Sequence, residues 1–499
     1  MGRAAGIPSG FLTQVAHQPD APALVWHHET TTYAELNQLA AAARQRIEQL
    51  DLADDEPVAI LAKKSPLAIA LVLACLQSGR RFLLPSPTLA EATLNSVVER
   101  AGCRVLLSPD DELPISARPQ APRAPRAIQP TDVSFMLTTS GSTGLPKVVP
   151  LSHVAVERFT AWACGKFCIG PGRTVLNYAP LNFDLCLLDI WTTLRYGGKV
   201  VLVDSDHATN GAHLLDLIVR HRVNVVQSVP MFYRLLVDAV SDPKPALDRV
   251  EHVIFTGDAI PARTLVELPE LFGRARLYNI YGCTETNDSF IHEVDAIDLL
   301  DAGAEPLPLG RPLPGVRTLI VEPNGNVLTG SGTGELYVST PFQTEGYLDQ
   351  TLNADKFVPH PLGQDQLPYL RTGDLVRRTS DGRIVLQGRN DFQVKVRGVA
   401  VNTAEIERVL LDHDQVAEAA VVALADPVAG RKLHAAVRRS GDGRLNSLVL
   451  RQHTAQRLVA AAIPSTIRIV DEPLPKTSTG KVDRKLVERS FAVANNQGE

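Results

Sequence analysis

The spacing of apolar residues predicts alternating helices and strands in the first part of the chain. Between residues 32 and 50 apolar side chains recur at helical spacing after a threonine start, which predicts an amphipathic helix. The short apolar run at 56–62 predicts a buried strand. The segment at 66–79 predicts a buried helix that ends at Gly79, and its apolar run is too short to span a bilayer.

The same alternation continues through the middle of the chain, with an amphipathic helix at 213–222. Further strands are expected at 104–107, 133–137, 199–203, 223–229, 252–258 and 275–282. Strands that are apolar almost throughout and alternate with helices are typical of buried parallel sheets. After about residue 305 short strands separated by Gly, Asn and Asp turns predict a smaller β-rich subdomain.

A second change of pattern, near residues 389–391, predicts a domain boundary. A compact α+β unit is expected beyond it, with Thr403 as a helix cap, strands at 394–398, 416–424 and 433–439, and helices at 403–413 and 450–463. We therefore predict an α/β protein. A large N-terminal domain (1–389) holds parallel α/β sheets plus the β-rich subdomain, and a small mobile α+β C-terminal domain (390–499) follows. The Pro- and Arg-rich stretch at 115–130 is expected to be an exposed loop.

Composition narrows the class of protein. The chain has 499 residues, too many for one hydrophobic core. Apolar residues make up 44%, charged residues 21%, and the net charge is -5, which gives no sign of nucleic acid or an anionic membrane as a partner. The six cysteines form no CxxC pair, and the N-terminus lacks the apolar core of a signal peptide. A cytoplasmic protein with reduced thiols is expected.

The segment TTSGSTGLPK, at 138–147, carries the first chemical signal. Its glycines and small hydroxyl residues allow backbone N–H groups to approach an anion closely, and Lys147 adds a positive charge. The spacing differs from a Walker A loop, because Val148 follows the lysine where Ser or Thr is required. Glycine and serine runs of this kind also occur as plain surface loops, so the exact string is what favours a phosphate site.

Five further motifs follow this loop in a fixed order: YGCTETN (281–287), GELYVS (334–339), YLRTGDL (369–375), GRNDFQVKVRG (388–398) and PKTSTGKVDRK (475–485). Together the six segments resemble the adenylate-forming (AMP-binding) superfamily, and in particular a stand-alone amino acid adenylation enzyme of the nonribosomal peptide synthetase type. The resemblance implies two half-reactions. A carboxylate attacks the α-phosphorus of ATP to give an acyl-adenylate and pyrophosphate, and a thiol then displaces AMP. ATP and Mg²⁺ are the implied cofactors.

The resemblance implies a role for each motif residue at the nucleotide. Thr284 contacts the α-phosphate, Glu285 binds Mg²⁺, Tyr281 stacks on adenine, and Asn279 binds the adenine amine. Asp374 accepts hydrogen bonds from the ribose hydroxyls, with Arg389 in support. The phosphates are held by Thr139, Ser140, Gly141, Ser142, Thr143, Gly144 and Lys147.

The C-terminal motifs imply a moving part. Lys481 is the implied catalytic lysine, chosen over Lys476 because it follows a glycine. Asp391 falls at the implied hinge, about which the C-terminal domain rotates between the half-reactions. Lys481 would then be withdrawn, and the strand around Gly398 would take its place beside the thiol path.

The substrate is indicated by LNFDLCLLDIW at 181–191, which resembles the substrate motif of amino-acid-activating members. Asp184 lies where a carboxylate pairs with the α-ammonium group, and a buried cation needs such a partner. The other implied pocket residues are Leu185, Leu188, Gln227, Ile254, Thr256, Ile280, Asp288 and Ser289.

The orientation of Asp288 leaves two kinds of substrate open. Facing inward, Asp288 would suit a side-chain hydroxyl or amine, whereas facing outward it would leave a small apolar slot for alanine or proline. A small or polar amino acid is favoured. The β-amino acids also stay open, because a displaced amine could use a different carboxylate.

No carrier site with the Gly-Gly-x-Ser pattern follows Lys481. The expected thiol is therefore the phosphopantetheine arm of a separate carrier protein, in peptide or polyketide natural-product biosynthesis. Three alternatives remain: an acyl- or aryl-CoA ligase, a D-alanyl carrier protein ligase, and a non-catalytic relative that binds a nucleotide. Asp184 weighs against the first, and the intact motif residues weigh against the last.

Overall fold

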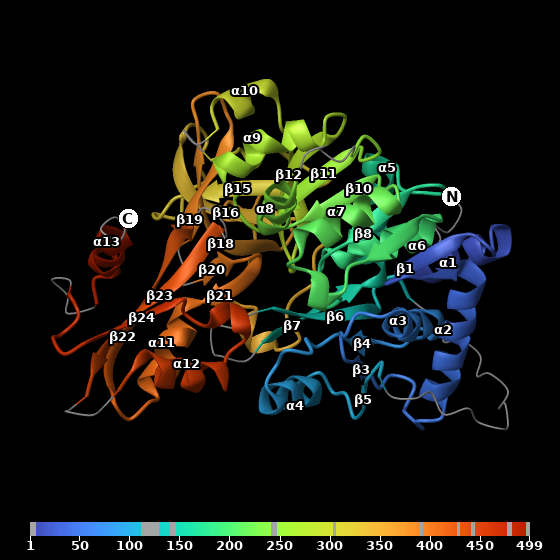
Figure 1. Ribbon diagram of the computed structural model, residues 1–499, viewed down its shortest axis with the longest axis horizontal. Helices are drawn as coiled ribbons and strands as arrows, with labels where there is room; N and C mark the ends of the chain where they lie inside the picture. Colours follow the sequence, from blue (N-terminus) through green and yellow to red (C-terminus); the bar gives the residue numbers. More distant parts are fainter. Residues whose placement is uncertain are drawn as a thin grey trace.

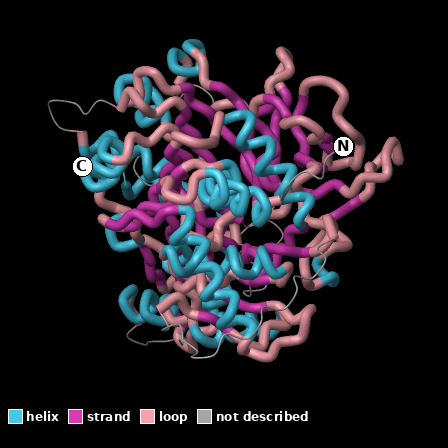
Figure 2. The backbone as a smooth tube through the Cα atoms, turned by 90° about the vertical axis from the view of Figure 1, so that its right-hand side faces the viewer, coloured by secondary structure: helices cyan, strands magenta, loops and turns pink. Residues whose placement is uncertain are grey.

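The protein is described here from a computed structural model, which places residues 6–110, 129–139, 146–240, 247–302, 306–389, 393–426, 430–440, 445–476 and 482–495. Within these ranges the strands form five sheets. Helices α1 and α13 lie on opposite sides of the molecule (Figure 1). Figure 2, turned by 90°, shows strands running between and behind helices, as expected for layered α/β architecture.

The largest sheet is the nine-stranded one, in the order β14-β13-β12-β11-β10-β8-β9-β1-β2. Its strands are β1 (Pro22–Trp26), β2 (Glu29–Thr32), β8 (Thr174–Asn177), β9 (Lys199–Leu202), β10 (Val225–Ser228), β11 (His252–Thr256), β12 (Arg276–Cys283), β13 (Asn287–Glu293) and β14 (Arg311–Pro312). The run from β1 through β9, β8, β10 and β11 to β12 is parallel, and the outer strands are antiparallel. The predicted parallel sheet is confirmed.

A second sheet has the order β5-β3-β4-β6-β7 and is parallel except at its last pair. Its strands are β3 (Val58–Ile60), β4 (Phe82–Leu83), β5 (Leu106–Leu107), β6 (Val133–Thr139) and β7 (Lys147–Ser152). The helices along these two sheets are α1 (Ile7–His17), α2 (Tyr33–Glu48), α3 (Pro66–Ser78), α4 (Glu91–Arg100), α5 (His153–Phe167), α6 (Thr193–Tyr196), α7 (Gly211–Arg220), α8 (Pro230–Ala239), α9 (Ala262–Leu271) and α10 (Ala296–Leu300). Two short helices join them, the π-helix η1 (Leu187–Thr192) and the 3-10 helix η2 (Ser205–His207).

The β-rich subdomain is a third sheet, as predicted. It consists of β15 (Arg317–Val321), β16 (Gly332–Ser339), β17 (Phe357–Val358), β18 (Tyr369–Arg378) and β19 (Ile384–Arg389), with the 3-10 helix η3 (Gln350–Leu352) beside it. Every pairing in this sheet is antiparallel.

The C-terminal region holds a hairpin of β20 (Gln393–Val396) and β21 (Val399–Asn402), and a sheet of β22 (Val416–Asp426), β23 (Gly430–Arg439) and β24 (Thr466–Val470). Its helices are α11 (Thr403–Leu411), α12 (Ser447–Ala455), η4 (Ala460–Ala462) and α13 (Arg484–Asn495). Its two apolar clusters draw only on residues 394–491, so this region has a core of its own (Figure 1).

Local capping explains where several helices begin and end. The Thr32 side chain accepts a hydrogen bond from the backbone N–H of Glu35, and the Glu35 carboxylate accepts one from the backbone N–H of Thr32. This capping box confirms the predicted start of α2. Helix α3 ends at Gly79, whose φ of 71° is the left-handed conformation that glycine adopts without strain.

Two local predictions in the C-terminal region are wrong. Thr403 is not the cap of α11. The Asn402 side chain caps it by accepting from the backbone N–H groups of Ala404 and Glu405, because an amide oxygen one residue earlier reaches the first turn. The helix predicted at 450–463 begins earlier and ends at Ala455, and the rest of that segment forms turns and the short η4. The loop predicted at 115–130 lies almost wholly outside the described residues.

Candidate active site

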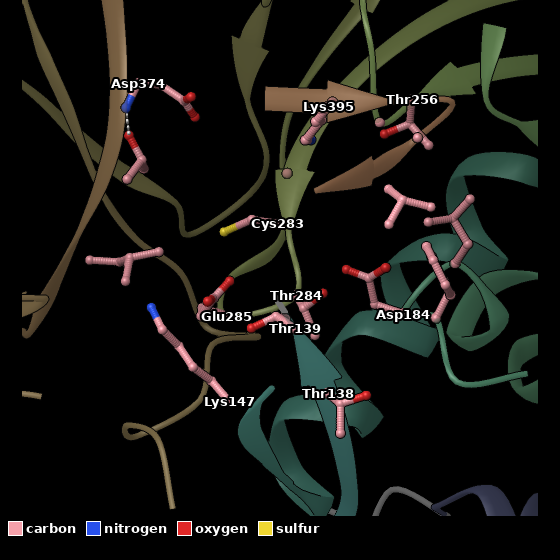
Figure 3. Close-up of a pocket in the computed structure, with 18 of the residues that line it drawn as sticks. Thr138, Thr139, Lys147, Asp184, Thr256, Cys283, Thr284, Glu285, Asp374 and Lys395 are labelled. Carbon is pink, nitrogen blue, oxygen red and sulfur yellow. Dashed lines mark hydrogen bonds between the residues drawn. The ribbon is translucent and has the colours of Figure 1, made fainter. Parts of the chain in front are cut away.

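A cavity of about 170 Å³ lies where four parts of the fold meet (Figure 3). It is lined by the ends of β6, β11 and β12, the turn at 182–185, the inner face of the β-rich subdomain, and the hairpin β20–β21. The carboxyl ends of β11 and β12 point toward it, which is the usual place for a ligand site in an open parallel sheet. Figure 3 shows Asp374 and Asp184 on opposite sides, with Thr284 and Glu285 between them.

Asp374 marks one end of the cavity and is tightly bonded. It is 7% exposed and accepts hydrogen bonds from the Tyr281 hydroxyl and, at 2.6 Å, from Nη1 of Arg389. Burial and the Asp374 charge raise the pKa of Tyr281 far above its usual value, so the phenol remains a donor. Tyr281 and Asn279 do not line the cavity. The side-chain nitrogen of Asn279 instead donates to the carbonyl of Pro308 at 2.9 Å.

Glu285 lies in the middle of the cavity beside an aromatic ring. Its Oε1 accepts from the Tyr347 hydroxyl at 2.7 Å, and Nζ of Lys147 lies 4.9 Å from the centre of that same ring. Thr139, Lys147 and Glu285 all line the cavity. Most of the predicted phosphate loop between Thr139 and Lys147 lies outside the described residues, namely Ser140, Gly141, Ser142, Thr143 and Gly144.

Asp184 marks the opposite end, in the turn before η1. Burial raises the pKa of its carboxyl group, and the charge of Lys395 and a hydrogen bond from the Thr284 hydroxyl partly counter that rise. Lys395 comes from the hairpin strand β20, as Figure 3 shows. Thr284 therefore lies between the predicted phosphate region and the carboxylate predicted to hold an ammonium group.

Four of the nine predicted substrate residues line the cavity: Asp184, Leu185, Thr256 and Asp288. Asp288 thus faces inward, and the outward arrangement is not the one observed. The other five do not line it: Leu188, Gln227, Ile254, Ile280 and Ser289.

A buried polar network explains the position of Gln227. Its amide nitrogen donates at 3.0 Å both to the carbonyl of Leu185 and to Asp189, a wholly buried carboxylate on the π-helix η1. Asn177 donates to the other oxygen of Asp189 at 3.1 Å. Burial raises the pKa of Asp189 well above its usual value. The Gln227 amide therefore braces the turn that carries Asp184.

The hairpin β20–β21 contributes Lys395, Gly398 and Val399 to the cavity wall. Gly398 has a φ of 80°, and a Cβ atom there would overlap the side chain of Val229 from the N-terminal region. Glycine at this position thus permits both the turn and the close approach. Lys481 and Asp391 lie outside the described residues.

Sequence reasoning missed several residues of the cavity wall, notably Tyr347, Lys356, Arg371 and Lys395. Lys395 lies in the motif GRNDFQVKVRG (388–398). A charged residue between the apolar residues of that predicted strand was a sign, present in the sequence, that it belongs to the site. Tyr347 has no such signal, because its contact with Glu285 joins residues far apart along the chain.

Two family models match this chain. The model of AMP-binding enzymes matches residues 11–348, and that of the AMP-binding enzyme C-terminal domain matches residues 405–481. The chain belongs to the AMP-binding enzyme family. The predicted resemblance is confirmed, and with it the expectation of a ligase chemistry that uses ATP.

Relatives within this family carry more specific names. An L-proline--[L-prolyl-carrier protein] ligase of Pseudomonas fluorescens is 36% identical over 73% of this chain and 70% of its own length. A ligase of the same name from Streptomyces coelicolor is 31% identical over 91% of this chain and 90% of its own. The structure of NpsA-ThdA, an artificially fused adenylation–PCP di-domain NRPS from Klebsiella oxytoca, superposes with a TM-score of 0.79 at 25% identity, covering 93% of this chain and 94% of that one.

The metal expected for this family is Mg²⁺, and the cavity fits it. Within the described ranges no cluster of three or more His, Cys, Asp or Glu side chains is present. Mg²⁺ needs no such cluster when phosphates supply oxygens, since one or two carboxylates then suffice. Glu285 lines the cavity and is a carboxylate, the kind of ligand that Mg²⁺ binds. None of the described helices is both long and apolar enough to cross a bilayer.

Proposed function

We propose that this AMP-binding enzyme activates an amino acid with ATP and loads it onto the phosphopantetheine thiol of a separate carrier protein. In the first step a carboxylate oxygen of the amino acid attacks the α-phosphorus, and pyrophosphate leaves. In the second step the thiol sulfur attacks the acyl carbon, and AMP leaves. The two relatives of similar length named as prolyl-carrier protein ligases support this assignment.

Asp184 carries the choice of an amino acid over other acids. It is a carboxylate at the end of the cavity opposite Asp374, so it suits the α-ammonium group of a substrate whose own carboxylate points toward Thr284. A fatty or aryl acid has no charge that would offset it. Asp184 therefore disfavours a CoA ligase acting on such acids.

The remaining roles are those that the sequence motifs imply. Asp374 and Arg389 hold the ribose, and Lys147 and the loop before it hold the phosphates. Glu285 would hold Mg²⁺, which would supply positive charge to the phosphate oxygens. Lys481 stabilises charge as the adenylate forms.

Movement of residues 390–499 about Asp391 separates the two half-reactions. Support comes from the hairpin in the cavity wall, because Lys395 and Gly398 occupy one approach to the reacting end. That is the arrangement expected for thiol transfer, when Lys481 has left the site.

The test is exchange of labelled pyrophosphate into ATP, measured across amino, fatty and aryl acids. We expect exchange with amino acids only, and its loss in Lys481→Ala. Transfer is then followed by the mass of a phosphopantetheinylated carrier, with coenzyme A in a parallel reaction. Exchange supported best by acids that lack an amine, or a thioester formed with coenzyme A alone, would contradict the proposal.

A further inference from the structure

The substrate end of the cavity holds two carboxylates, Asp184 and Asp288. The proposed function uses only the first, for the α-ammonium group. What Asp288 binds is a separate question, and its answer rests on that proposed function.

The backbone around Asp288 is shaped to bring its side chain to the cavity. The pairing of β12 with β13 shifts register after Tyr281, in a β-bulge. Gly282 permits this, because a Cβ atom there would overlap the carbonyl of Asn287, which itself has a φ of 57°. The neighbours of Asp288 on the strand, Asn287 and Ser289, are at most 3% exposed and do not line the cavity. The bulge thus leaves Asp288 as the residue of β13 that lines the cavity.

Asp288 has no partner within the described part of the chain that would balance its charge. Its Oδ2 atom is buried and makes no hydrogen bond there. Burial and the neighbouring charge of Asp184 raise the pKa of Asp288 to about 8, and no described cation counters that rise. Asp184 differs, because Thr284 donates to it and Lys395 lies near it.

We propose that Asp288 binds a second ammonium group, so that the substrate is a short diamino acid such as 2,3-diaminopropionate or 2,4-diaminobutyrate. The α-ammonium group neutralises Asp184, which removes the second of the two causes that raise the pKa of Asp288, after burial. The side-chain ammonium group then pairs with an ionised Asp288. A short chain fits, because Asp184 and Asp288 line the same cavity of about 170 Å³.

A hydroxyl group is the rival ligand, and burial argues against it. A substrate hydroxyl is matched equally well by a buried Ser, Thr or Asn, each of which costs less to bury than a carboxylate. Thr256 already lines the same cavity as a neutral hydroxyl. An added carboxylate without a cation therefore favours a charged ligand.

Pyrophosphate exchange decides between these ligands in the wild-type chain. The panel contains 2,3-diaminopropionate, 2,4-diaminobutyrate, serine, alanine, proline, glycine and propionate at pH 8. We expect the highest kcat/KM with one of the two diamino acids. In Asp288→Asn that value falls by roughly 100-fold, because a buried ammonium group loses its counter-charge. Values for alanine and serine change little. Glu293→Gln, which removes an exposed carboxylate at the far end of the same strand, should behave as wild type.

The outcomes separate the two proposals. A preference for serine, alanine, proline or glycine overturns the diamino acid assignment and leaves amino acid activation standing, and so does a diamino acid preference that Asp288→Asn does not alter. Exchange with propionate but with no amino acid, or with no acid at all in a folded chain, overturns the proposed function and the substrate assignment with it.

Discussion

At one end of the cavity Asp374 is bonded to Arg389 and Tyr281, whereas at the other end Asp184 and Asp288 have one described cation nearby, Lys395. That lysine belongs to the C-terminal hairpin. At the proposed nucleotide end the charge of Asp374 is therefore balanced by Arg389 of the same subdomain before any ligand arrives. At the proposed amino acid end burial raises the pKa values of Asp184 and Asp288, so a positively charged ligand is needed to balance both carboxylates in their ionised form. A carboxylate that is already paired with a cation, such as Asp374, is suited to a ligand that donates neutral hydrogen bonds. Carboxylates that lack such a partner in the described structure, such as Asp288, are suited to a positively charged ligand.

The sharpest way to test this contrast is Asp184→Asn. We expect kcat/KM for the amino acid in pyrophosphate exchange to fall by roughly 1,000-fold, because a buried ammonium group loses its counter-charge. The affinity for ATP, measured by calorimetry, should stay unchanged. Asp301→Asn removes an exposed carboxylate that does not line the cavity and serves as control. Equal losses for ATP and amino acid would show that Asp184 supports the whole site.

Asp374→Asn tests the other end. Asn removes the charge that accepts from Nη1 of Arg389 and from the Tyr281 hydroxyl, and we expect KM for ATP to rise by about 30-fold with KM for the amino acid nearly constant. Asp381→Asn removes an exposed carboxylate just beyond the same strand and is the matched control. A rise confined to the amino acid would contradict the assignment of the two ends.

Gly398→Ala tests the hairpin that brings Lys395 to the amino acid end. The added Cβ atom would overlap Val229, so the hairpin could not approach the N-terminal region as closely as it does here. We expect carrier loading to slow by about 10-fold, while pyrophosphate exchange persists. Gly382→Ala is a close control, since Gly382 has a φ of 84° but open space around it. If both variants lose transfer equally, backbone strain and not the contact is responsible.

The smallest effect expected is on stability. The pKa of Asp288 is raised to about 8 from an ordinary 3.8, so the folded chain binds more protons than the unfolded chain between those values. The contribution of this group to stability therefore falls as pH rises through that window. Asp288→Asn removes the group, and we expect its Tm to exceed that of wild type by about 2–4 °C at pH 9 and by less at pH 5. A difference that does not grow with pH would contradict the raised pKa.

Sequence patterns predicted the sheets well because their signals are local. The apolar runs predicted strands β9, β10 and β11. Thr32 predicted the start of α2, and Gly79 predicted the end of α3. The cap of α11 and the bounds of α12 were predicted wrongly. At α11 two adjacent residues, Asn402 and Thr403, can both cap, and only the backbone geometry separates them.

Within the site, Asp184 and Asp288 line the cavity, as expected from their places in and beside sequence motifs, and their roles toward the substrate stay predictions. Gln227 lies away from the cavity because Asp189 binds its amide, and that contact depends on how η1 packs against β10. The contact of Tyr347 with Glu285 likewise depends on tertiary structure. Such pairings arise only when the chain folds, so periodicity and spacing carry no trace of them.

The π-helix η1 sets a limit on how this pocket can be re-engineered. A π-turn holds one more residue than an α-turn, and here the wider turn aims Asp189 at both Asn177 and Gln227. Deleting one residue from 187–192 would close it to an α-helix and rotate the preceding turn by about 100° about the axis. Asp184 would then leave its place. Grafting this segment from another member of the family will therefore succeed only if the donor has the same number of residues, however well its side chains match.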